Sequence, residues 1–226
     1  MCCRGGMRAV SLALWDIRTG TGKLWPAGAA LACVYAAYWA VMFFMKADAG
    51  PEDRLPVLFV ASVFFAFCVP ASVYGHINDP ADGIGYAMLP VRARIKFAVM
   101  LTVSALFFPL CFYTGLHILD CLLTAAGGGK GFSGMIWSTE GGLSLRSFWS
   151  DFGKISLYQS VFILGNILLK HHKIAMTVLA TLAMHGIFFG LLQIERSGIL
   201  YFLYNYAGPV QLWAGAYAAF RKLRFC

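Results

Sequence analysis

Apolar positions in this chain are grouped into long stretches without charged residues, and charged or strongly polar residues border each stretch. Apolar and polar positions do not alternate within them, which favours helices over strands. At about 1.5 Å per residue, a helix of roughly 20 residues crosses the approximately 30 Å hydrocarbon core of a bilayer. The pattern therefore predicts membrane-spanning helices over 24–45, 55–75, 97–119, 174–194 and 197–220.

A sixth apolar stretch is shorter than the others. Only 15 uncharged residues separate Lys154 from Lys170, which is fewer than a span requires. Phe148 and Trp149 extend the apolar run upstream, and a lysine near a helix end can reach the interface. We therefore expect a sixth span over 150–169 and an all-α fold, a polytopic membrane bundle of about six helices. Three prolines within spans should kink the helices without ending them: Pro70, Pro109 and Pro209.

The composition supports lipid, and not water, as the main surroundings of the chain. Of 226 residues, 60% are hydrophobic and only 12% are charged, whereas soluble domains are about half apolar and a quarter charged. The net charge is +8, but the basic residues lie between apolar blocks and form no continuous basic run, so nucleic acid is not an expected partner. The seven cysteines include no CxxC motif, so neither a disulfide framework nor a zinc site is indicated.

Lysine and arginine are distributed unevenly between alternate connections. With the N-terminus in the cytoplasm, 12 of them lie inside and 6 outside, so the positive-inside rule favours both ends in the cytoplasm. The expected layout is a cytoplasmic segment at 1–23, a six-helix membrane domain at 24–220, an outer loop at 120–149 and a cytoplasmic tail at 221–226.

The longest cytoplasmic connection, 76–96, combines turn residues, a short apolar stretch and a basic end. An apolar segment with basic flanks can lie in the membrane interface or bind a soluble partner. The alternative is an ordinary loop whose basic residues only set the orientation.

Two segments of the chain carry distinctive residue patterns. The first segment has an aromatic residue, Leu-Pro and a Lys-Phe pair that opens the third span; the matching residues are Tyr86, Met88, Leu89, Pro90, Lys96 and Phe97. The second has a Phe-x-Leu-Gly segment and a Lys-x-x-x-Thr; the matching residues are Phe162, Leu164, Gly165, Lys170, Lys173 and Thr177. Together these residues resemble segments of bacterial membrane proteins related to type-2 ATP-binding-cassette permeases, although Ile95 stands where those proteins usually have an acidic residue.

The resemblance implies a permease-like subunit of an exporter in the bacterial cytoplasmic membrane. In such permeases, the connection between spans two and three docks a separate cytoplasmic ATPase, and two membrane subunits form a homodimer or heterodimer. The substrate would be hydrophobic or amphipathic. The docking residues implied here are Asp79, Asp82, Tyr86, Met88, Leu89, Pro90, Arg92, Arg94 and Lys96.

Two further features bear on this resemblance. The N-terminal segment, with Leu12, Leu14 and Trp15 between arginines, could form an interfacial helix before the first span, or a frayed tail. The last outer loop consists only of Glu195-Arg196, too short for the re-entrant helices that type-2 permeases commonly carry there. The alternative function is therefore a non-transporting membrane scaffold or accessory protein with the same fold.

Motifs for nucleotide binding or hydrolysis are absent from the sequence. It contains no GxxxxGK[ST], HExxH or GxSxG, so we expect no enzyme activity, cofactor or metal in this chain. Polar residues within or beside the spans are functional candidates, namely His117, Asp120, Asn166 and His185. His117 and Asp120 are three residues apart and share a helix face. A proton or metal role for them competes with interhelical hydrogen bonding, which we favour.

Overall fold

The computed structural model describes residues 3–75, 77, 86, 88–89, 91–128, 130–136, 145–169, 173–194 and 207–222. These residues contain no strand, apart from a single bridge between Ala49 and Phe132. An all-helical fold is confirmed for this part of the chain. The helical elements are α1 (Cys3–Phe44), α2 (Pro51–Tyr74), α4 (Ala93–Leu101), the π-helical segment η1 (Thr102–Phe107), α5 (Phe108–Ala126), α6 (Leu145–Leu168), α7 (Lys173–Ile194) and α9 (Gly208–Lys222).

Three helices of the described chain are long and apolar enough to cross a membrane. They cover Ala9–Phe44, Pro51–Tyr74 and Ala93–Ala126, the last of which joins α4, η1 and α5. Helices of this length and composition are typical of a membrane protein.

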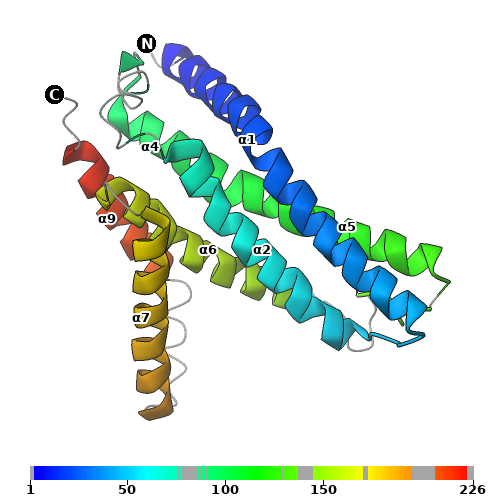
Figure 1. Cartoon of the computed structure of the whole chain (residues 1–226). Coiled ribbons are helices and arrows are strands. Elements are labelled where there is room, and N and C mark those ends of the chain that lie inside the picture. Colours follow the sequence, from blue (N-terminus) through cyan, green and yellow to red (C-terminus); the bar gives the residue numbers. More distant parts are fainter. Residues whose placement is uncertain are drawn as a thin grey trace.

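The helices form a bundle in which α2 and α6 are central (Figure 1). Helix α2 packs against α1, α5 and α6, and α6 packs in turn against α7 and α9. Helix α1 begins, α4 begins and α9 ends at the same end of the bundle (Figure 1). The start of α2 and the end of α5 lie at the other end.

The central place of α6 explains its polar sequence. Its buried side chains include Ser156, Gln159, Ser160 and Asn166. Neighbouring helices shield these groups from lipid, so α6 does not need the continuous apolar surface of α1 or α2. Its sequence therefore carries a weaker membrane signal than its neighbours.

Helices α1, α5 and α6 extend beyond the bounds expected for their spans. Helix α5 continues through Asp120 to Ala126, and α6 already begins at Leu145, so the connection expected over 120–149 is shorter. The carboxylate of Asp120 does not end the helix because it is buried in an ion pair. Helix α1 runs without a break from Cys3 into the first expected span, although Pro26 removes one backbone hydrogen bond.

Pro109 changes the helix geometry of the third span without ending it. Proline has no N–H and clashes with the carbonyl four residues earlier. The turns before it widen into η1, where the amide of Phe108 bonds to the carbonyl of Val103, five residues back. In this region the side-chain amide of Gln159 on α6 donates to the carbonyl of Ser104.

Candidate functional site

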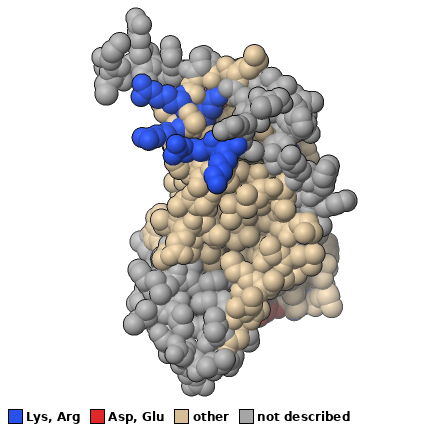
Figure 2. All heavy atoms as spheres, turned by 90° about the vertical axis from the view of Figure 1, so that its left-hand side faces the viewer, with Lys and Arg blue, Asp and Glu red and all other residues tan. Residues whose placement is uncertain are grey.

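Exposed basic side chains gather at the end of the bundle where α4 begins and α9 ends (Figure 2). Four of them lie at these helix ends: Arg92, Arg94, Arg221 and Lys222. The connection between α1 and α2 and the first turn of α2, at the opposite end, carry one exposed lysine and three exposed acidic residues: Lys46, Asp48, Glu52 and Asp53. The first end, called the basic end below, is therefore the expected cytoplasmic side under the positive-inside rule.

Tyr86 and Lys96 form a reciprocal contact that fixes the segment before α4. The amine of Lys96 donates to the carbonyl of Tyr86 at 2.8 Å and lies 5.6 Å from the centroid of its ring. The hydroxyl of Tyr86 donates to the carbonyl of Lys96 at 3.4 Å. Burial raises the pKa of Tyr86, so its hydroxyl stays protonated and remains a donor. Both residues are buried, so the segment is held at its two ends.

Between these two anchors, other side chains point outward. Met88 is 79% exposed. Arg92 and Arg94 are also exposed, whereas Leu89 is partly buried against the core. The described part of 86–94 thus presents a sulfur-containing apolar side chain next to two positive charges.

The anchored segment is connected to α1 and α2 by a buried polar pair. The hydroxyl of Tyr74, near the end of α2, donates to the carboxylate of Asp16 on α1 at 2.7 Å. Tyr74 also meets Tyr86 edge to face, with ring centroids 6.3 Å apart. A displacement of Tyr86 would therefore disturb the end of α2 and, through Asp16, its contact with α1.

Apart from the partly buried Leu89, the predicted docking residues divide into three groups. Tyr86 and Lys96 face inward; Met88, Arg92 and Arg94 are exposed. Asp79, Asp82 and Pro90 lie outside the described residues. Sequence reasoning did not identify the contribution of Asp16 and Tyr74, because a single acidic residue in a helix gives no sign of its partner.

A second polar cluster lies at the opposite end, around a fully buried ion pair. Arg54 at the start of α2 donates to both carboxylate oxygens of Asp120 on α5, at 2.9 and 3.1 Å. The same guanidinium donates to the hydroxyl of Thr124 at 2.9 Å. Tyr35 on α1 donates to Asp120 at 2.5 Å. The cluster therefore joins three helices.

The loop 130–136 completes this cluster from outside the helices. Arg54 donates to the carbonyls of Ser133, at 3.3 Å, and Gly134, and its guanidinium lies 4.7 Å from the ring of Phe132. Gly134 has a φ of +71°, a conformation that favours glycine. With these acceptors the charge of Arg54 is compensated without water.

Three of the predicted polar residues, His117, Asp120 and Asn166, have described side chains and lie in different surroundings. His117 lies against the ring of Tyr113, with centroids 4.5 Å apart, and no described hydrogen bond joins it to Asp120. Asn166 lines a small cavity with Tyr74 and Ser104. The side chain of His185 lies outside the described residues. The described part of the chain contains no group of three or more histidine, cysteine or acidic residues placed to hold a metal ion.

The second resembling segment places a glycine directly against a threonine. A Cβ atom on Gly165 of α6 would collide with the side chain of Thr177 on α7. Thr177 is only 2% exposed. The small residue thus permits close packing of the two helices, as glycine does in many membrane bundles.

Comparisons with family models, curated proteins and solved structures find no match for this chain.

Proposed function

We propose that this protein is the membrane subunit of an ATP-binding-cassette type exporter and docks a separate cytoplasmic ATPase through 86–94. The observation that carries the proposal is the Tyr86–Lys96 contact, which holds a segment with exposed Met88 and two arginines against the helix ends. A rigid connection to α1 and α2 is what coupling requires, because a loose loop would not transmit motion.

The proposal includes six spans, with the basic end in the cytoplasm and the anchored segment facing the ATPase. The resemblance of the two segments to type-2 permeases and the charge difference between the two ends support it. Two such subunits would alternately expose a pathway for a hydrophobic or amphipathic substrate, driven by closure of the ATPase.

A photo-crosslinking amino acid at position 88 tests the docking. The variant is expressed in its native host, irradiated in intact membranes and purified gently. We expect a crosslinked partner that binds ATP-agarose and hydrolyses ATP. The matched control carries the same amino acid at Phe44, which is 80% exposed at the opposite end of the bundle, and it should capture no such protein.

The alternative, a non-transporting scaffold, gives a different result. A partner without ATP binding, captured at position 88 in repeated experiments, would contradict coupling to an ATPase and favour the scaffold. Equal capture of an ATPase at positions 88 and 44 would contradict the proposed docking surface.

A further inference from the structure

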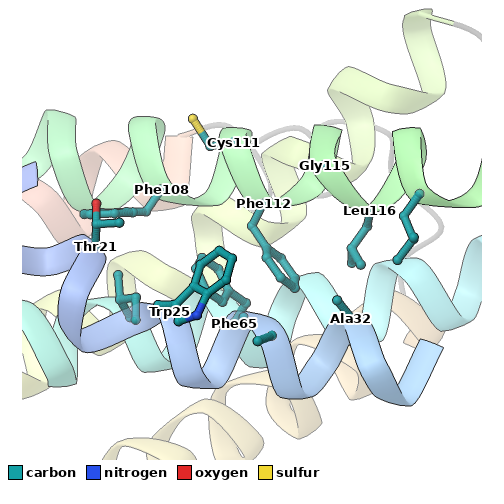
Figure 3. A pocket seen from close by; sticks show the side chains of 13 residues that line it. Thr21, Trp25, Ala32, Phe65, Phe108, Cys111, Phe112, Gly115 and Leu116 are labelled. Carbon is teal, nitrogen blue, oxygen red and sulfur yellow. The ribbon is translucent and has the colours of Figure 1, made fainter. Parts of the chain in front are cut away.

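A groove of about 330 Å³ separates α1 from α5 on the outer surface of the bundle (Figure 3). Small residues form much of both walls: Gly28, Ala29 and Ala32 on α1, and Cys111 and Gly115 on α5. Its floor is a stacked pair, Phe65 on α2 and Phe112 on α5, with ring centroids 4.0 Å apart. The groove exists because small side chains cannot fill the space between the two helices.

The two helices meet beyond each end of the groove. At the basic end, a Cβ atom on Gly20 would lie 2.8 Å from the ring of Phe108. At the other end, Tyr35 bonds to Asp120. The groove is therefore closed along its axis and opens sideways, toward the lipid.

The length of the groove matches one leaflet of the membrane. Its α1 wall extends from Thr21 to Ala32, which corresponds to about 16 Å at 1.5 Å per residue. The hydrocarbon core is about 30 Å thick, so the groove spans roughly half of it. A membrane helix about 10 Å wide that crosses the whole core does not fit between two closed ends, whereas a single acyl chain does.

The basic end of the groove carries groups suited to a lipid head group. Trp25 is 72% exposed at the rim, and tryptophan favours the membrane interface. Arg18 is exposed, and it precedes Thr21 by three residues and Trp25 by seven, so all three share one face of α1. The hydroxyl of Thr21 donates to the carbonyl of Ile17, so Arg18 is the member of these three that carries a positive charge.

We propose that the groove between α1 and α5 binds one acyl chain of an anionic phospholipid from the leaflet at the basic end, with Arg18 contacting the head group. The apolar walls bind the chain, and the guanidinium pairs with the phosphate. The proposal does not depend on the function proposed above.

Filling the groove tests the acyl-chain site. A Cβ atom on Gly115 would meet no atom within 4 Å, and the same is true of Gly215 on α9, outside the groove. Gly115→Leu therefore fills the groove without displacing its neighbours, and Gly215→Leu is the matched control. Ala29→Leu fills the groove from the opposite wall.

The measurement is native mass spectrometry of the purified proteins with added phosphatidylglycerol or phosphatidylcholine. We expect the wild type and Gly215→Leu to retain one phosphatidylglycerol, and both groove variants to bind it about tenfold more weakly, a loss of about 1.4 kcal/mol. Arg18→Gln should remove the preference for phosphatidylglycerol while leaving chain binding intact. Thermal unfolding in detergent confirms that each variant is folded.

Three results would overturn the proposal. Equal lipid retention by the wild type and both groove variants would exclude the acyl-chain site. An unchanged lipid preference in Arg18→Gln would exclude the head-group contact. A groove variant that dissociates a dimer while retaining its lipid would assign the groove to a second copy of the chain.

Discussion

The side chains of Arg54 and Asp120 are fully buried. Burying either charge alone, away from water, would destabilise the folded protein. The cost is offset because the pair shares hydrogen bonds with Tyr35, with Thr124 and with the loop after α5. The described polar groups that contact the pair, from Tyr35, Thr124, Ser133 and Gly134, all take part in hydrogen bonds to it. We therefore assign it to structure: it fixes α1, α2 and α5 at the end opposite the anchored segment.

Breaking this pair from one side should destabilise the protein more than removing both charges. Asp120→Ala leaves the guanidinium of Arg54 buried without its counter-ion, which should lower the free energy of unfolding by about 3–5 kcal/mol. The double variant Arg54→Met with Asp120→Leu should lose less. Unfolding in mixed detergent micelles, followed by circular dichroism, measures both. A double variant at least as unstable as the single one would contradict the assignment.

Lys96 should hold the anchored segment in place. Losing a hydrogen bond to a charged donor costs about 1.5–3 kcal/mol, so Lys96→Met should accelerate amide exchange around Val91 and Ile95 by about tenfold or more. Hydrogen exchange read by mass spectrometry measures this. Arg94→Met, a similar change at an exposed position two residues away, is the control. Similar exchange in both variants would show that Lys96 does not anchor the segment.

At the scale of elements, the sequence predicts a helix better than it predicts its ends. Apolar continuity correctly placed helices at the first three expected spans, because lipid-facing helices need an apolar surface over their whole length. The apolar pattern predicts the end of α5 too early, because a charged residue such as Asp120 resembles the start of a loop. Its burial depends on Arg54, 66 residues away, and such a pairing leaves no local pattern.

The contact between α6 and α7 yields a prediction at this scale. Gly165→Val should force the two helices apart and cost about 1–3 kcal/mol, as overpacking does elsewhere. Gly186→Val introduces the same residue on α7, where a Cβ atom would meet nothing, and should cost less. Adding Thr177→Ala to Gly165→Val removes the colliding atoms and should restore part of the loss. Detergent unfolding distinguishes the outcomes, and an absence of rescue would argue against this contact.

At the scale of the whole molecule, polar groups at the two ends of the bundle have different roles. The ion pair at one end joins helices, and the Tyr86–Lys96 contact at the other supports an exposed, basic surface. The charge difference between the ends was visible in the sequence, since loop composition alone determines it. The two buried polar clusters could not be predicted from the sequence, because each joins residues from separate helices.

The central claim is that a membrane separates these two ends. In a chain whose Cys2, Cys3, Cys121 and Cys226 are replaced by serine, Asp48→Cys and Met88→Cys each introduce a thiol at an exposed site at opposite ends. We expect a membrane-impermeant maleimide to label Asp48→Cys in intact cells and Met88→Cys only in inside-out vesicles. Labelling of both from the same side, or of Met88→Cys in intact cells, would contradict the account.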